Sequence, residues 1–123
     1  MSSILQPGRR ARGSRSGRPI MVLLDLLGRR MTLRILWELS QACQPLTFRA
    51  LQLAAETNPS VLNSRLRELR AARIVEHGAG GYQLSATGDS LVGLILPLHA
   101  WAERWAAQAK SARGTAARTP RKT

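Results

Sequence analysis

The sequence predicts a mainly α-helical domain with one small β-hairpin. Apolar residues recur at helical spacing through most of the chain between residues 20 and 110. Only Ile74–His77 and Tyr82–Leu84 read as strands, and they flank the glycine-rich segment Gly78–Gly81. Two short predicted helices, Phe48–Ala55 and one that begins after Asn58, are separated by a turn, as in a helix-turn-helix. A hairpin directly after such a pair is a wing, so the expected fold is a winged helix-turn-helix.

Composition indicates one domain with an aliphatic core. The chain has 123 residues, 44% of them hydrophobic and only 4% aromatic, which is enough for a core without disulfides or metals. Cys43 is the only cysteine, so we expect a reducing compartment and an inert, buried thiol. No apolar run approaches the ~18 residues of a membrane span, and no signal peptide is recognised. We therefore expect a cytoplasmic, bacterial-type protein.

The net charge of +12 lies in the tails. Residues 1–18 and 110–123 each carry five basic residues and no acid, which leaves nine basic and seven acidic residues between 19 and 109, a net of +2 (12 − 5 − 5). We expect residues 1–18 and 111–123 to be disordered tails and residues 19–110 to form the domain. Such basicity indicates a polyanionic partner, nucleic acid before membrane.

Two helices should precede the helix-turn-helix. Ile20–Leu27 carries Ile20, Leu23, Leu24 and Leu27 on one face and ends at Gly28. The segment from Arg30 to Gln41 is apolar almost all round, which predicts the central helix of the core.

The predicted second helix of the helix-turn-helix organises the rest of the chain. In the third helix, Phe48 and Leu51 should point inward with Leu53 beside them, and Thr47 is its expected N-cap. In the next helix, Leu62, Leu66 and Leu69 form one apolar stripe, with Asn58 as N-cap and Pro59 at the first helical position. Ser60, Ser64 and Arg67 lie opposite that stripe and Asn63 flanks them, and such side chains can reach base edges and phosphates.

A long helix should follow the wing. Ser85 can cap a helix from Ala86 to about Lys110, which Pro97 should kink or split. Within it, Leu91, Leu94, Leu98, Trp101 and Trp105 step by three and four residues, as in a coiled-coil seam. Core packing is the plain explanation of such a stripe, but two late tryptophans favour a dimer seam.

The sequence indicates no catalytic, metal-binding or phosphate-binding site. His77 and His99 are the only histidines, and neither has a metal-ligand spacing. Gly78–Gly81 joins two strands, whereas a phosphate-binding loop joins a strand to a helix. We expect no enzyme, no catalytic residue, no metal and no cofactor.

Several motifs resemble one family. Leu24–Leu36 is similar to L-D-x-I-G-G-K-W-T-L-x-I-L, Leu46–Leu51 to R-F-x-E-L, and Val61–Leu69 to V-L-T-x-R-L-[KR]-E-L. Ile74–Glu76 and Leu84–Leu91 are similar to G-L-[IV]-x-R and L-T-x-x-G-x-x-L. On these motifs, residues 18–105 resemble the HxlR-type transcriptional regulators, relatives of the MarR winged-helix proteins.

The resemblance implies a homodimer on double-stranded DNA, with one recognition helix per subunit in successive major grooves. It implies base contacts by Ser60, Asn63, Ser64 and Arg67, phosphate contacts by Arg30, Thr47, Arg49 and Arg65, and a dimer interface on the first and last helices, at Ile20, Leu23, Leu24, Leu94, Leu98, Trp101 and Trp105. The chain departs from the family at Arg18, which stands before Pro19 where some members carry a sensing cysteine, at Met31, which replaces a tryptophan, and in a shorter wing.

The sequence leaves three functions open. The first is a sequence-specific regulator, a repressor by preference, acting as a homodimer on an inverted repeat, with a small-molecule effector conceivable. The second is an architectural nucleic-acid binder driven by the tails, whose affinity would be strongly salt-dependent. The third is a winged helix that contacts another protein.

Overall fold

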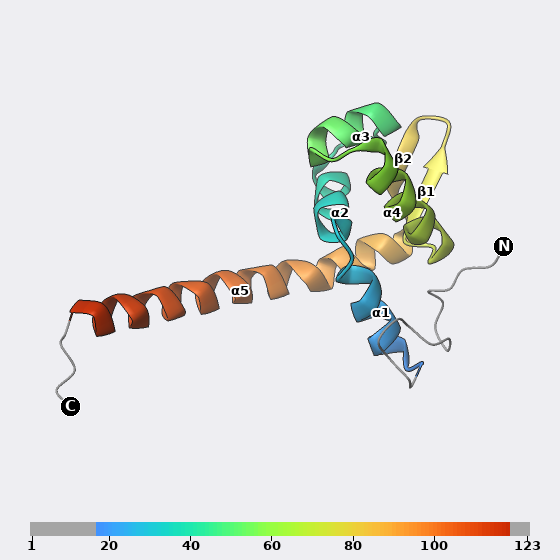
Figure 1. Cartoon of the computed structure of the whole chain (residues 1–123). Helices are drawn as coiled ribbons and strands as arrows, with labels where there is room; N and C mark the ends of the chain where they lie inside the picture. Colours follow the sequence, from blue (N-terminus) through green and yellow to red (C-terminus); the bar gives the residue numbers. More distant parts are fainter. Residues whose placement is uncertain (1–16, 119–123) are drawn as a thin grey trace. The chain divides into compact units, whose positions relative to one another are not determined.

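The computed structural model describes residues 17–118, so most of the predicted N-terminal tail and residues 119–123 lie outside the described residues. Within residues 17–118 there are five helices and one two-stranded antiparallel sheet (Figure 1). This confirms the predicted fold class. By contact density the chain divides at Val92 into two units, each described by itself below. The elements are α1 Pro19–Leu27, α2 Thr32–Gln41, α3 Phe48–Ala55, α4 Pro59–Ala71, β1 Val75–Gly78, β2 Gly81–Leu84 and α5 Ala86–Arg118.

The helix-turn-helix forms where its capping residues predict it. The Thr47 hydroxyl oxygen accepts from the Ala50 amide at 3.1 Å and begins α3. The Asn58 side-chain oxygen accepts from the Val61 amide at 2.8 Å and begins α4. Between them, Glu56 adopts a left-handed conformation with φ 54° and ends α3. Both caps satisfy amides that have no partner inside the helix, which fixes the turn between the helices.

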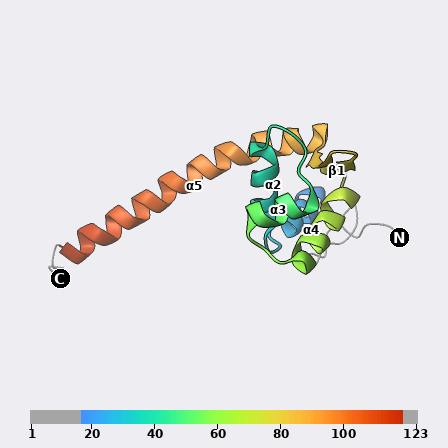
Figure 2. The same ribbon diagram turned by 90° about the horizontal axis from the view of Figure 1, so that it is seen from above.

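The core of the first unit is aliphatic, as predicted. α2 packs against α1, α3 and β2, and α4 packs against β1; Figure 2 shows α2, α3 and α4 together from above. The buried hydrophobic residues are Val22, Leu26, Ile35, Leu36, Leu39, Leu51, Ala55, Leu62, Leu66, Leu69, Ile74, Val75 and Val92.

Four expected burials are wrong. α2 buries Ile35 and Leu36 but exposes Leu33 and Trp37, because the elements that it packs against cover only one of its sides. Leu53 is 64% exposed, since it lies two residues, or about 200°, round α3 from the buried Leu51. Cys43 is exposed because it lies in the loop after α2 and not on a packed helix end.

The wing is tied to the segment before α3. β1 and β2 pair with His77 opposite Tyr82, and the two rings stack with their centroids 4.0 Å apart. Leu46 and Tyr82 exchange two backbone hydrogen bonds, of 2.9 and 2.7 Å. Gly81 has φ 126°, and a Cβ atom there would overlap the Leu46 carbonyl, so only glycine fits this close approach.

The last helix is longer and less interrupted than predicted. The Ser85 hydroxyl accepts from the Gly88 amide at 3.0 Å, which confirms Ser85 as the cap. The helix then continues through Pro97 without splitting and ends at Arg118 instead of near Lys110. A proline removes one hydrogen bond of the helix ladder, and here the 33-residue helix continues despite that loss.

Gly88 is the point where α5 meets the wing, and it predicts an asymmetric pair of substitutions. A Cβ at Gly88 would overlap the Ile74 carbonyl oxygen and lie 3.2 Å from a Leu84 methyl, whereas no described atom lies within 4 Å of one at Gly93. Gly88→Ala should lower the free energy of unfolding by about 1–3 kcal/mol through overpacking. Gly93→Ala, the control in the same helix, should leave it unchanged or raise it by up to about 1 kcal/mol. Urea unfolding measures both, and equal effects would contradict the close packing.

Candidate nucleic-acid interface

The side chains expected to contact bases share one surface of α4. Leu62, Leu66 and Leu69 are 0%, 2% and 0% exposed, so this stripe is fixed in the core. On the other side, Ser60, Asn63 and Arg67 are exposed and Ser64 is partly exposed. The hydroxyls, amide and guanidinium therefore face outward together, as hydrogen-bonding groups that can reach base edges in a groove.

The residues expected at phosphates fall into two kinds. Arg30, Thr47 and Arg49 are exposed, just before α2, at the N-cap of α3 and in its first turn. Although the Thr47 hydroxyl oxygen already accepts a hydrogen bond from the Ala50 amide, its proton is still available for donation. The Arg65 side chain is only 18% exposed, because an ion-pair network holds it.

That network joins α1, the α1–α2 turn and α4. Arg29 Nη2 donates a hydrogen bond to Asp25 Oδ2, and Arg29 Nη1 donates one to Glu68 Oε2, both at 2.8 Å. Arg65 Nε lies 2.9 Å from Glu68 Oε1 without hydrogen-bond geometry, and Arg65 Nη2 donates to Glu68 Oε2 at 3.3 Å. Arg65 Nη1 donates to the Arg30 carbonyl at 3.3 Å. Glu68 thus pairs with two arginines and connects α4 to the chain that carries Arg30.

The charge of Arg29 is secured by its partners. Burial acts to lower the pKa of Arg29, but the hydrogen bond that Arg29 donates to Asp25 and the nearby charge of Glu68 outweigh burial, and the pKa of Arg29 is raised above its usual value. The guanidinium therefore keeps its charge at any physiological pH. This role of Asp25, Arg29 and Glu68 was not predicted from the sequence. The i, i+4 spacing of Asp25 and Arg29 is a local signal for one ion pair, but the pairing of Arg29 with Glu68 spans 39 positions.

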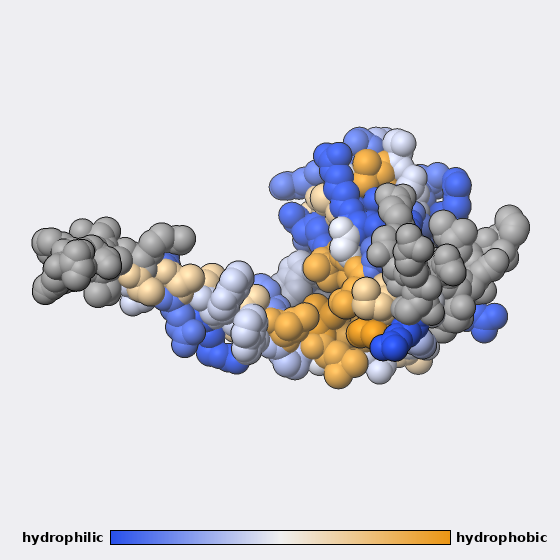
Figure 3. All heavy atoms as spheres, turned by 60° about the horizontal axis from the view of Figure 1, so that its bottom comes forward, coloured by the Kyte–Doolittle hydropathy of each residue, from blue (hydrophilic) through white to orange (hydrophobic). Residues whose placement is uncertain are grey.

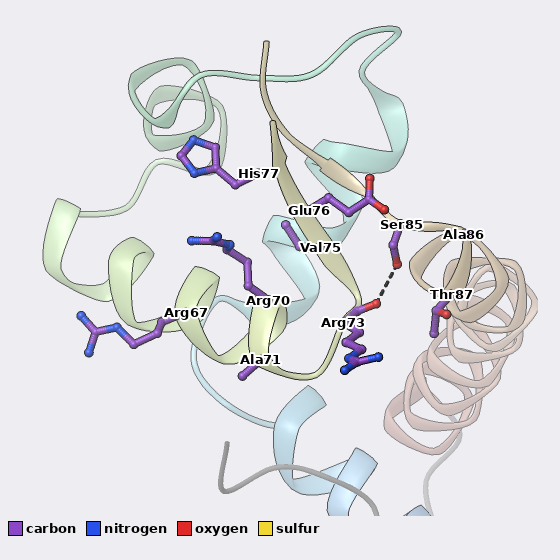
Figure 4. Close-up of a pocket in the computed structure, with 10 residues that line it drawn as sticks. All are labelled: Arg67, Arg70, Ala71, Arg73, Val75, Glu76, His77, Ser85, Ala86 and Thr87. Carbon is purple, nitrogen blue, oxygen red and sulfur yellow. Dashed lines mark hydrogen bonds between the residues drawn. The ribbon is translucent and has the colours of Figure 1, made fainter. Parts of the chain in front are cut away.

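A second group of arginines has no such partners. Within the described part of the chain, the side chains of Arg67, Arg70 and Arg73 make no hydrogen bond or ion pair. They line an open hollow of about 680 Å³ between α4, β1 and the start of α5 (Figure 4). Its other residues are Ala71, Val75, Glu76, His77, Ser85, Ala86 and Thr87. Arg70 and Arg73 were not among the residues expected to contact DNA.

The expected dimer residues are exposed and apolar. In the first unit, α1 exposes Ile20 and Leu24 and partly exposes Leu23. Figure 3 shows apolar residues, in orange, at the surface of the chain. In the second unit, Leu94, Leu98, Trp101 and Trp105 are all exposed. The two indole rings stack along the helix, with centroids 6.0 Å apart and planes within 11°.

Among the described residues, no group of three His, Cys, Asp or Glu side chains could hold a metal ion. Long as α5 is, neither it nor another helix within residues 17–118 has a stretch apolar enough to cross a membrane.

The geometry defines a class of protein. Two capped helices joined by a tight turn, a hairpin wing and an outward polar face on the second helix make a winged helix-turn-helix, the fold of DNA-binding regulators. The profile of the HxlR-like helix-turn-helix family matches residues 26–110, and the chain belongs to that family. It is a DNA-binding transcription regulator with double-stranded DNA as its partner. A comparison with curated proteins gave no match.

The network around Glu68 predicts a stability effect that an exposed ion pair should not show. Glu68→Ala removes the carboxylate partner of Arg65 and one of the two carboxylate partners of Arg29, whose side chains are 18% and 12% exposed. The free energy of unfolding should fall by about 1–3 kcal/mol, since one partly buried guanidinium loses its carboxylate and a second loses one of two. Glu38→Ala, which removes the i, i+4 partner of Arg34 on the surface, should cost less than about 0.5 kcal/mol. Guanidinium unfolding compares the two, and similar losses would mean that the network does not hold α4.

Proposed function

We propose that this protein is a sequence-specific repressor that binds an inverted-repeat operator as a homodimer in the cytoplasm. The observation that carries the proposal is α4: its leucines are buried to 2% or less, so the polar face of Ser60, Asn63, Ser64 and Arg67 is held outward. Repression needs only that a bound dimer occupy a promoter, which requires no surface beyond those described.

Each outward side chain of α4 has a base that suits its chemistry. A guanidinium such as that of Arg67 can donate two hydrogen bonds to O6 and N7 of guanine. The Asn63 amide can pair with N6 and N7 of adenine, and the Ser60 and Ser64 hydroxyls can bond to several bases. We assign Arg30, Thr47 and Arg49 to the flanking phosphates. Arg65, the fourth expected phosphate contact, would act there mainly by orienting Arg30 through its carbonyl.

A second copy of the chain is the proposed cover for the apolar surfaces of α1 and α5. Leu94, Leu98, Trp101 and Trp105 keep coiled-coil spacing while exposed, which suits a symmetric contact in which the same patch meets itself. Monomeric proteins rarely leave so many neighbouring large apolar side chains in water. A two-fold dimer would place its recognition helices on half-sites about one helical turn apart.

The proposal is tested by selecting random double-stranded DNA with the intact chain and with residues 19–110, at physiological salt. An inverted repeat recovered by both, with half-sites about one turn apart, is the expected result. If neither enriches a sequence and the shorter chain no longer binds, the protein is a tail-driven nucleic-acid binder and the proposal fails. If neither chain binds DNA at all, the surface of α4 serves a protein partner.

The dimer seam predicts the effect of one introduced charge. Leu98 is 61% exposed in the single chain, so Leu98→Glu should leave folding intact but bury a carboxylate in the dimer. We expect dissociation to monomers by analytical ultracentrifugation and loss of operator binding. Ala107→Glu adds the same charge to an exposed position of α5, about 150° round the helix from the seam, and should remain dimeric. A Leu98→Glu dimer as tight as the wild type would exclude this seam.

A further inference from the structure

We propose that Arg70 and Arg73, at the carboxyl end of α4, form a second DNA contact that binds the phosphodiester backbone beside the half-site without reading sequence. The inference rests on the DNA binding proposed above and adds a contact that the wing lacks. The turn between the strands is Ala79–Gly80, which carries no charge. The unpaired positive groups next to the wing come instead from the end of α4.

The backbone at Arg73 shows that folding does not require an arginine there. The Arg73 amide donates to the Arg70 carbonyl and the Ile74 amide to the Leu69 carbonyl, both at 2.9 Å, and Arg73 has φ 63°. This is a Schellman cap, whose left-handed residue is usually glycine because a Cβ atom is strained in that conformation. An arginine at this position therefore costs stability relative to glycine.

The Arg73 side chain makes no polar contact that offsets the strain of its backbone. It is exposed and has no hydrogen-bond or ion-pair partner within residues 17–118. The contact that Arg73 does make runs through its backbone, because the Ser85 hydroxyl donates to the Arg73 carbonyl at 2.7 Å (Figure 4). Glycine would keep that carbonyl, so the guanidinium is free to act on a partner outside the chain.

The hollow has the charge and form for a polyanion. Arg67, Arg70 and Arg73 contribute three positive charges against the single carboxylate of Glu76, which accepts a hydrogen bond from Gln83 at 3.2 Å. Arg67 and Arg70 lie three residues apart on α4, a rise of about 4.5 Å, and Arg73 lies in the left-handed cap just beyond the end of this helix. Figure 4 shows the three side chains leaving α4 and its end at successive points of the chain, with their guanidinium groups pointing in different directions. Three guanidinium groups without a partner in the described residues, spread around one open hollow beside a base-reading residue, suit the spaced phosphates of a strand backbone.

The experiment measures salt-dependent binding of the full chain to a duplex of arbitrary fixed sequence, about 30 base pairs long so that it spans two half-sites. Arg73→Gly should raise the melting temperature by roughly 4–8 °C through relief of strain. It should also weaken DNA binding about five- to tenfold at ~0.1 M salt and reduce the salt slope by about one. Arg70→Ala should weaken binding and reduce the slope to the same extent.

Two matched controls separate charge from structure. Arg73→Lys keeps the charge and the strained backbone, so its melting temperature and salt slope should match the wild type. Arg104→Ala removes one exposed positive charge from a part of α5 that contributes no residue to the hollow, and should leave both values unchanged. A higher melting temperature for Arg73→Gly with an unchanged salt slope would overturn the proposal, since the residue would then affect only folding.

A duplex obtained by selection distinguishes this inference from the function on which it rests. Arg73→Gly should lose affinity equally for the selected and the arbitrary duplex, whereas Asn63→Ala should lose it on the selected duplex alone. If Asn63→Ala behaves in that way and Arg73→Gly binds both duplexes like the wild type, the backbone contact fails and the regulator stands. If the wild type and every variant bind the selected and the arbitrary duplex with equal affinity, sequence-specific binding itself fails.

Discussion

The proposed DNA-facing surface depends on the packing of three leucines of α4 into an aliphatic core. Leu62, Leu66 and Leu69 are buried to 2% or less, and burial of each such side chain contributes about 1.5–3 kcal/mol. A helix anchored along one stripe cannot rotate, so every residue opposite that stripe is committed to the surface. Glu68 adds a polar tie on the flank of the same helix, to Arg29 beyond the end of α1. The chemistry of the outward face is therefore presented in a fixed direction.

The carboxylates of the first unit pair with arginines away from the outward face of α4, so this face keeps its positive charge. Asp25 and Glu68 neutralise Arg29 and Arg65, and Glu38 neutralises Arg34. Asp25 and Glu68 thus connect α1 and α4 through Arg29, while the outward face and the end of α4 keep arginines without a partner in the described residues. Although residues 19–109 carry a net charge of only +2 (nine basic, seven acidic), three arginines without a described partner line one hollow beside the proposed recognition helix. Distribution, more than total charge, makes the domain a DNA-binding surface.

Local signals made much of this architecture predictable from sequence. Asn58 and Ser85 cap the predicted helices because capping needs only residues three positions apart. Periodicity also identified the buried stripe of α4. Burial on a short helix was less predictable. Leu53 is exposed because the elements that pack against α3 lie on another side of this helix. The tie between Arg29 and Glu68 and the strained backbone of Arg73 depend on tertiary contacts and cap geometry, which apolar periodicity does not encode.

The central claim is that α4 reads bases through its outward face, and one measurement tests it most directly. The affinities of wild type and Arg67→Ala are compared across a set of operator duplexes, each with one base pair changed. If Arg67 donates to a guanine, the variant loses on the order of 1–3 kcal/mol and becomes indifferent to substitution at one position of each half-site. A loss of the same size on every duplex, with the preference at each position unchanged, would show that Arg67 contacts only the backbone and would contradict the claim.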